Sequence, residues 1–203
     1  MKNSFAAGGR SVDLVELVPR GDRDIVLARL ATPLSGVAPL KAAAAAAASG
    51  STVKVAGFGR TATTWGTGSG PRTTAQVLGT VAATTVDLSP VSGAAAVCAG
   101  DTGAPLLNGG GEITGVVSRA WQAGCLGTPA SETRTGAQAA RLDGLDAWIT
   151  PLTNRSFDLL NPASGRCLNV KGAGPSWDNG TPIILFDCKG DPNEKFELVS
   201  VKA

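Results

Sequence analysis

The chain has 203 residues, 43% of them hydrophobic and 17% charged, which is enough for one ordinary domain with an extension and is not the composition of a disordered protein. Its net charge of +2 gives no electrostatic reason to expect nucleic acid or an acidic membrane as a partner. No apolar run reaches the roughly 18 residues of a membrane span, and the N-terminus lacks the apolar stretch of about 7–15 residues that marks a signal peptide.

The first predicted strands lie between residues 11 and 30. Residues 11–18 alternate between apolar and polar side chains, which predicts a strand, and a turn at 19–22 follows. A second strand is expected from Asp24 to Leu30. Taken alone, an aspartate at the start of a strand is typical of turn capping.

Residues 33–52 form a connection that contains two prolines and the alanine run 42–48. The run either forms a short helical turn or, as we expect, a surface link. Residues 53–61 again alternate like a strand, and residues 73–88 contain one or two further strands after a turn-rich stretch.

Residues 98–107, CAGDTGAPLL, form the most distinctive stretch of the chain. The glycines on either side of the Asp-Thr pair allow the backbone to bend tightly. Two neighbouring amides in such a turn can point at one oxygen atom, as an oxyanion hole requires. The alternative is an ordinary glycine-rich hairpin. A hairpin turn at 108–111 and a returning strand at 112–118 are expected next.

The four cysteines fall into two local pairs, Cys98 with Cys125 and Cys167 with Cys188. This spacing predicts two small disulfide loops, each stabilising the fold by about 3 kcal/mol, in an oxidising compartment. Metal ligation is the rival interpretation. It is disfavoured because the chain has no Cys-x-x-Cys motif and no histidine.

The stretch 98–107 resembles the nucleophile loop of trypsin-like serine proteases of the secreted bacterial type, Cys-x-Gly-Asp-Ser-Gly-Gly-Pro-Leu. Thr102 replaces the serine and Ala104 the second glycine. Residues 24–30, 53–61 and 112–118 resemble the family segments Asp-Ile-Ala-Leu-Leu-x-Leu, Val-x-Gly-Trp-Gly-x-Thr and Leu-x-Gly-Val-x-Ser. Residues 142–149 resemble the family's short C-terminal helix.

This resemblance implies the roles of the candidate site residues. Asp24 is the triad aspartate, Thr102 stands at the nucleophile position, and the amides of Gly100 and Thr102 form the oxyanion hole. Three residues line the specificity pocket: Ala96 at its floor, with Ser118 and Ala120 along its side. Because the floor carries no carboxylate, the pocket should not select Arg or Lys by charge.

The stretch from residue 157 onward resembles one repeat of a ricin-type β-trefoil lectin. The resemblance implies sugar contacts at Asn169, Phe186 and Asn193, although Asn169 replaces an aspartate and Phe186 a tryptophan of the family. A β-trefoil needs about three such repeats, and the chain holds one. The alternative is a structural appendage held by a disulfide.

The expected fold is therefore all-β. It is a chymotrypsin-like double β-barrel with the first barrel incomplete, followed by a short C-terminal helix and one β-trefoil-type repeat. The expected parts are a first-barrel remnant at 1–40, an inter-barrel linker at 41–52, the second barrel at 53–150, a linker at 151–156 and the lectin-like repeat at 157–203.

The expected function is that of a secreted serine-type endopeptidase acting on peptide or protein substrates, with no cofactor and no metal. The chain as written should be inactive or very weak, since losing the base costs about 10⁴–10⁶ in rate and the β-methyl of Thr102 crowds the nucleophile. Either Met1 is an internal start and the histidine lies upstream, which we favour, or the chain is a degenerate protease. The alternative function is non-catalytic binding of glycans or proteins by a pseudoprotease.

Overall fold

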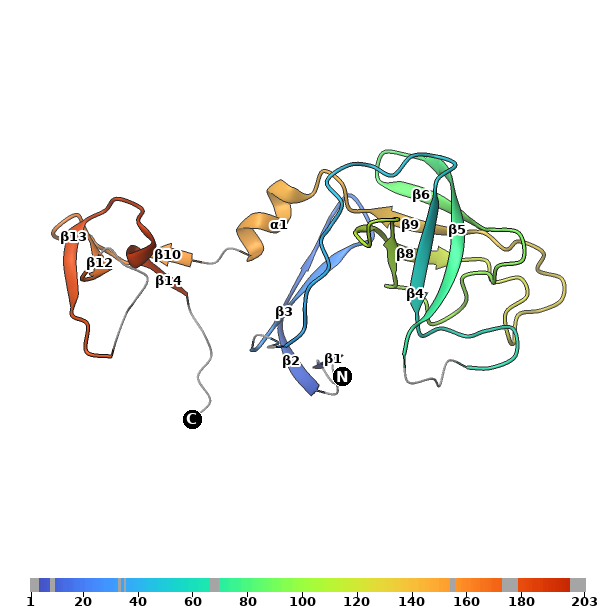
Figure 1. The fold of residues 1–203 in the computed structure, drawn as a ribbon, viewed down its shortest axis with the longest axis horizontal. Coiled ribbons are helices and arrows are strands. Elements are labelled where there is room, and N and C mark those ends of the chain that lie inside the picture. Colours follow the sequence, from blue (N-terminus) through green and yellow to red (C-terminus); the bar gives the residue numbers. More distant parts are fainter. Residues whose placement is uncertain are drawn as a thin grey trace. The chain divides into compact units, whose positions relative to one another are not determined.

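A computed structural model describes residues 4–7, 10–32, 34, 36–65, 70–153, 156–172 and 179–197. It divides into two compact units, residues 1–146 and 147–203 (Figure 1). The described residues are mostly β, with one α-helix, α1 (Asp146–Thr153), and one short 3-10 helix. None of the helices in these ranges is long and apolar enough to cross a membrane.

A closed antiparallel barrel forms the main body of the first unit (Figure 1). Its strands, in the order β4-β5-β6-β9-β8-β7, are β4 (Thr52–Gly57), β5 (Arg72–Val81), β6 (Thr85–Pro90), β9 (Ala137–Arg141), β8 (Ile113–Ala120) and β7 (Pro105–Leu107). Along β4 buried and less buried residues alternate, with Val53 and Val55 facing the core, as the sequence pattern predicts. The core also contains Leu78, Val86, Leu88, Val97, Leu106, Val117, Ala137 and Ala139.

The N-terminal strands form a separate open sheet in the order β1-β2-β3: β1 (Ser4–Ala7), β2 (Arg10–Pro19) and β3 (Val26–Leu30). The strand predicted at 11–18 is confirmed as β2. The strand predicted from Asp24 begins two residues later, because residues 21–24 form the turn that precedes it. Val15, Leu17 and Val26 of this sheet are exposed.

The alanine run forms no helix and is largely a surface link, as expected. It is nevertheless attached to the barrel. The Ala43 amide donates a hydrogen bond to the carbonyl of Ile113 at 2.9 Å, and the Ile113 amide donates to the carbonyl of Lys41 at 2.8 Å. Ala43 is consequently buried against the barrel.

The helix predicted at 142–149 is displaced, beginning at Asp146 and ending at Thr153. The Leu142 amide still pairs with the carbonyl of Thr114, and Gly144 adopts a φ of 71°, which no α-helix accommodates. The linker expected from residue 151 therefore begins within the helix, which continues through Pro151.

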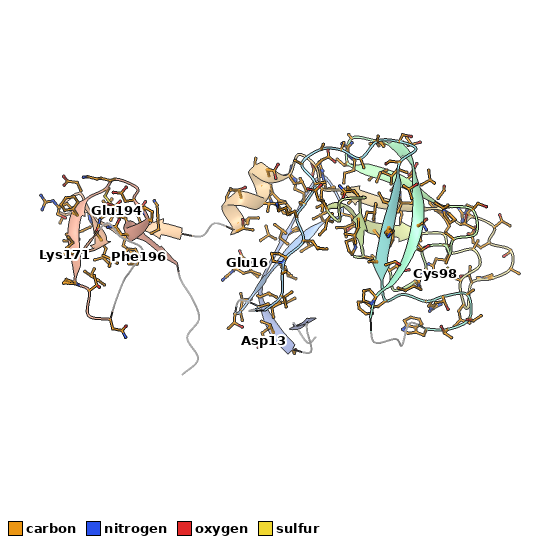
Figure 2. The ribbon with its side chains drawn as sticks, in the orientation of Figure 1. Asp13, Glu16, Cys98, Lys171, Glu194 and Phe196 are labelled. Carbon is orange, nitrogen blue, oxygen red and sulfur yellow. A yellow bond between two sulfur atoms is a disulfide. The ribbon has the colours of Figure 1, made fainter. Side chains whose placement is uncertain are left out.

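The second unit combines part of α1 with five short strands and the 3-10 helix η1 (Pro192–Glu194). Strand β10 (Ser156–Asp158) pairs with β14 (Lys195–Glu197), and β11 (Leu160–Asn161), β12 (Arg166–Val170) and β13 (Ile183–Asp187) form a second sheet. The Cys167–Cys188 disulfide joins β12 to the end of β13. Among the residues of this unit whose side chains are described, only Cys167, Asn169 and Glu194 are buried. Figure 2 labels Glu194. These strands do not demonstrate a β-trefoil repeat.

Candidate active site

Two consecutive tight turns shape the loop that carries Thr102. The Asp101 amide donates to the carbonyl of Cys98 at 3.1 Å, and the Ala104 amide donates to the carbonyl of Asp101 at 2.9 Å. Gly100 and Gly103 occupy the third position of each turn with φ values of 92° and 87°, which explains both glycines. Thr102 is exposed at the second position of the second turn.

The carboxylate of Asp101 holds this loop from inside. It is 1% exposed and accepts hydrogen bonds from the amides of Gly59 at 2.8 Å and Cys98 at 3.0 Å. It also forms an ion pair of 2.8 Å with Nη2 of Arg72, which in turn donates to the carbonyl of Arg60 at 2.7 Å. Every partner of this buried charge therefore lies within the barrel unit.

The glycines of the Gly57-Phe58-Gly59 stretch are explained by the same carboxylate. A Cβ atom on Gly57 would lie 2.2 Å from Oδ1 of Asp101, and one on Gly59 would lie 2.5 Å from its Cγ. A side chain at either position would displace Asp101, so the backbone approaches as closely as only glycine allows.

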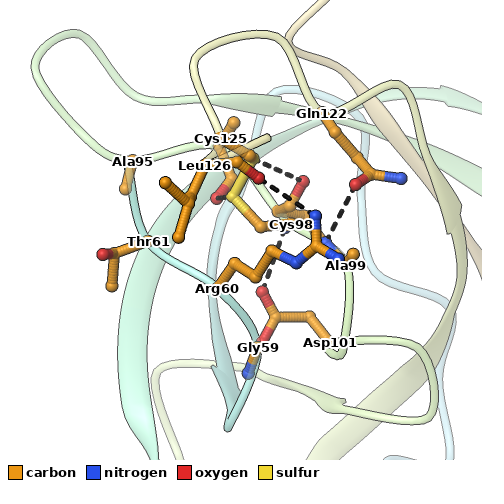
Figure 3. The surroundings of a disulfide bond; sticks show 12 residues. Gly59, Arg60, Thr61, Ala95, Cys98, Ala99, Asp101, Gln122, Cys125 and Leu126 are labelled. Carbon is orange, nitrogen blue, oxygen red and sulfur yellow. Dashed lines mark hydrogen bonds between the residues drawn. A yellow bond between two sulfur atoms is a disulfide. The ribbon is translucent and has the colours of Figure 1, made fainter. Parts of the chain in front are cut away.

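The Cys98–Cys125 disulfide ties the loop to the segment that follows β8 (Figure 3). Figure 2 labels Cys98 in the whole chain. Around it, the amide of Ala99 donates to Oε1 of Gln122 at 3.2 Å, and the amide of Arg60 donates to the carbonyl of Ala99 at 2.9 Å. Ala99 is thus held through both its amide and its carbonyl.

Asp24 meets the barrel at Ser118, 94 residues further along the chain. The Ser118 hydroxyl donates a 2.7 Å hydrogen bond to Oδ2 of Asp24. The turn that carries Asp24 is anchored by Arg23, whose Nη1 donates to the carbonyl of Arg141 at 2.9 Å. Asp24 itself is exposed, unlike the buried triad aspartate that the resemblance implies.

Strand β8 is bonded at two consecutive residues, Val117 and Ser118, to the loop that carries Thr102 and to the turn that carries Asp24. The amide of Gly103, next to Thr102, donates to the carbonyl of Val117 at 2.9 Å, and Ser118 bonds Asp24. One strand therefore positions both the loop of Thr102 and the turn of Asp24.

The backbone amides of Gly100 and Thr102, predicted to form the oxyanion hole, donate no hydrogen bond to any group in the described ranges.

The three residues predicted for the specificity pocket, Ala96, Ser118 and Ala120, are each half-buried. Trp121 follows Ala120, and its ring lies 3.7 Å from the position of a Cβ on Gly136.

The residues predicted to bind sugar lie in the second unit. Asn169 is buried and donates to Oε1 of Glu194 at 3.0 Å, while Nδ2 of Asn193 donates to Oδ1 of Asn169 at 2.7 Å. Both amides are therefore committed to internal hydrogen bonds. Phe186 is exposed on β13, with Nζ of Lys189 5.1 Å from its ring centre.

Sequence reasoning missed Arg72 and Gln122. Arg72 pairs with a residue 29 positions away and carries no local signal of that role. Gly57 and Gly59, near the end of the strand predicted at 53–61, did offer a signal of the close contact with Asp101, since glycine in a strand often marks a close backbone approach.

Comparison with known proteins identifies the family. The family model described as Trypsin matches residues 9–142, more than half of the chain. No curated protein sequence matches the chain significantly.

Solved structures share the fold at low identity. Neuropsin, a serine protease expressed in the limbic system of mouse brain, aligns with a TM-score of 0.57 and 17% identity, over 71% of this chain and 73% of its own. A mutant of human heparin binding protein (CAP37) aligns with a TM-score of 0.54 and 23% identity, over 72% of this chain and 68% of its own. An inactive mutant form of Rv3671c from M. tuberculosis aligns with a TM-score of 0.51 and 17% identity, over 74% of this chain and 71% of its own. On the strength of the family match, the chain belongs to the trypsin-like serine protease family.

Proposed function

We propose that the chain forms the peptide-binding cleft of a trypsin-like endopeptidase, with Thr102 at the nucleophile position and Asp24 as the orienting acid. The observation that carries this proposal is the attachment of both residues to adjacent positions of β8, through Gly103 to Val117 and through Ser118 to Asp24. Peptides or proteins are the substrate class that family membership implies.

We further propose that the amides of Gly100 and Thr102 form the oxyanion hole. Neither amide has a hydrogen-bond partner in the described part of the chain, and both lie in turns that are fixed by Asp101. Preorganised donors of this kind stabilise the negative charge that develops on a carbonyl oxygen under attack.

The proposed cleft has no base. A hydroxyl nucleophile must lose its proton as it attacks, and imidazole is the usual acceptor near neutral pH. The chain contains no histidine, and the carboxylate of Asp24 is bonded to Ser118. Missing triad members cost about 10⁴–10⁶ in rate, so this chain hydrolyses peptides at most very slowly.

Imidazole added from solution tests this proposal. A Thr102→Ser variant of the full chain should hydrolyse a p-nitrophenyl ester faster with imidazole present than the matched Thr102→Ala variant does. The increment reports a hydroxyl that an external base activates inside the cleft. Equal imidazole-dependent rates in the two variants would overturn the assignment of residue 102.

The substrate preference of the pocket and the location of the protein are two further parts of the proposal. With Ala96 at its floor, the proposed pocket has no carboxylate for selecting Arg or Lys. The two disulfides, Cys98–Cys125 and Cys167–Cys188, are consistent with a secreted or extracellular protein, and we propose secretion.

The second candidate function is glycan binding by the second unit. Exposed Phe186 favours it, since an exposed aromatic ring offers a platform for the apolar face of a sugar. The side-chain amides of Asn169 and Asn193 argue against glycan binding, because both are already used in hydrogen bonds within the unit. A glycan array probed with the full chain and with Phe186→Ala tests this function: binding lost in the variant supports it, and an empty array for both refutes it.

A further inference from the structure

A cavity of about 400 Å³ lies beside the Cys98–Cys125 loop and is separate from the residues assigned to the proposed cleft. One wall is Arg60, which follows β4, and the other comes from residues 121–132. Neither Thr102 nor Ala96, Ser118 or Ala120 lines it. Volumes of this size are typical of small-molecule sites.

Arg60 gives this cavity its charge. Its Nη1 donates to the carbonyl of Leu126 at 3.0 Å, and its guanidinium carbon lies 4.5 Å from the ring centre of Trp65. Within the described ranges it pairs with no carboxylate, and its buried Nε has no hydrogen-bond partner. The guanidinium group is thus held in place by these contacts, and no carboxylate in the described ranges balances its positive charge.

The other charged residue on the wall, Glu132, is already paired with a cation. Nε and Nη2 of Arg134 donate to its two oxygens at 2.8 and 2.6 Å. The side-chain hydrogen bonds from Arg134, assisted by its backbone amide, lower the pKa of Glu132 to about 2. Glu132 therefore stays ionised but is paired with Arg134, which leaves Arg60 as the charged lining residue without an oppositely charged partner in the described ranges, and its guanidinium favours an anion.

The remaining lining favours a ligand with a flat body. Trp121 contributes a half-buried indole ring, whose centre lies 5.5 Å from the guanidinium carbon of Arg134, and Thr128 and Ser131 contribute hydroxyl groups. An aromatic ring packs well on indole, and hydroxyls add donors for a carboxylate. The matching ligand class is a small aromatic carboxylate.

Two residues that line the cavity, Arg60 and Gln122, lie beside Ala99 in the loop of the proposed oxyanion hole (Figure 3). Gln122 accepts a hydrogen bond from the Ala99 amide, while the Arg60 amide donates to the Ala99 carbonyl. Gln122 adopts a φ of 71°, the sole non-glycine residue with positive φ among the described residues. Strain of this kind concentrates at functional sites.

We propose that this cavity binds a small aromatic carboxylate, with the anionic group on Arg60 and the ring on Trp121, and that occupancy steadies the turn at residues 98–101. A free aromatic acid and the C-terminal phenylalanine of a peptide present the same chemistry. The proposal does not depend on catalysis by Thr102.

An NMR titration of the full-length, nitrogen-15-labelled chain tests the proposal with three single-ring probes. Benzoate should shift the amides of Ala99 and Gln122 and the indole of Trp121, and should bind about tenfold more tightly than neutral benzamide. Cationic benzylamine should not bind. Equal affinity for benzoate and benzamide, or shifts confined to other residues, would overturn the proposal.

Two variants refine the test. Arg60→Gln should weaken benzoate binding by about tenfold, whereas Arg29→Gln, which removes the same charge from a residue outside the cavity, should leave it unchanged. Equal losses in both variants would contradict a role for Arg60. If Arg60→Gln fails to fold, the comparison of probes on the unmodified chain decides alone.

The source of the ligand is distinguished in the same titration. Acetyl-Ala-Phe with a free C-terminus presents the ring and the carboxylate on a peptide. Tighter binding of this peptide than of benzoate supports the proposal and assigns a peptide terminus, and the reverse order supports it and assigns a free acid. Failure of both to bind refutes it.

Discussion

Arg72 and Asp101 form an ion pair with 2.8 Å between Nη2 and Oδ2, and the carboxylate is 1% exposed. The pair links the start of β5 to the residue that precedes Thr102. The loop that carries the proposed nucleophile therefore depends on a charge within the barrel.

Replacement of Arg72 by methionine should destabilise the first unit by about 3–5 kcal/mol, because Asp101 is left as a buried, unpaired charge. Urea unfolding measures the loss. Arg134→Met is the control: Arg134 is 63% exposed in its own ion pair, so its removal should cost far less than the loss of Arg72. Similar losses for both variants would mean that Arg72 does not support Asp101.

Gly59→Ala should destabilise the barrel by about 1–3 kcal/mol, since its Cβ would lie 2.5 Å from Cγ of Asp101. Gly109→Ala is the matched control, because a Cβ there meets nothing within 4 Å and the cost should stay within about 0.5 kcal/mol. Thermal unfolding of both variants gives the comparison. A Gly59→Ala protein as stable as the control would show that the loop moves freely away from β4.

Ser118→Ala and Asp24→Asn should show a coupling free energy of about 0.5–1 kcal/mol in a double-mutant cycle, since their hydrogen bond involves a charge but is exposed to water. Denaturant unfolding of the two single variants and the double variant gives this value. A coupling of zero would mean that Asp24 and Ser118 do not interact in solution.

The parts predicted from the sequence are those with a local signal. Strand β2, the β7–β8 hairpin and the two disulfides each follow from alternation, turn residues or cysteine spacing within a short stretch. The helix bounds did not follow, because the positive φ of Gly144 depends on how Leu142 pairs with β8.

The supports of the candidate site were less predictable than its loop. Arg72 reaches Asp101 and Gln122 reaches Ala99 only once the barrel has closed, so neither role has a signature in neighbouring residues. The exposure of Asp24 was also missed, since resemblance to a buried aspartate says nothing about which segments cover it in this chain.

The second unit should lose stability in acid through Glu194. Burial alone would raise the pKa of this carboxyl group, but the amides of Lys189 and Gly190, with the side chain of Asn169, bring it below its usual 4.5. The unfolded state therefore binds the proton more readily. The stabilisation is present above about pH 4.5 and is lost as pH falls through the lower folded value.

Amide hydrogen exchange of residues 167–170 as a function of pH measures this loss. Glu194→Gln should flatten the acid dependence, because the glutamine side chain does not titrate in this range. An unchanged acid profile in the variant would assign the effect to other carboxylates.

Peptide hydrolysis by the Thr102→Ser variant, measured without added imidazole, tests the central claim that the proposed cleft lacks a base. The account predicts no hydrolysis above that of Thr102→Ala, because a serine hydroxyl without an acceptor for its proton stays a weak nucleophile. Hydrolysis by Thr102→Ser that the alanine variant lacks would contradict it, since a base would then be present in a chain that contains no histidine.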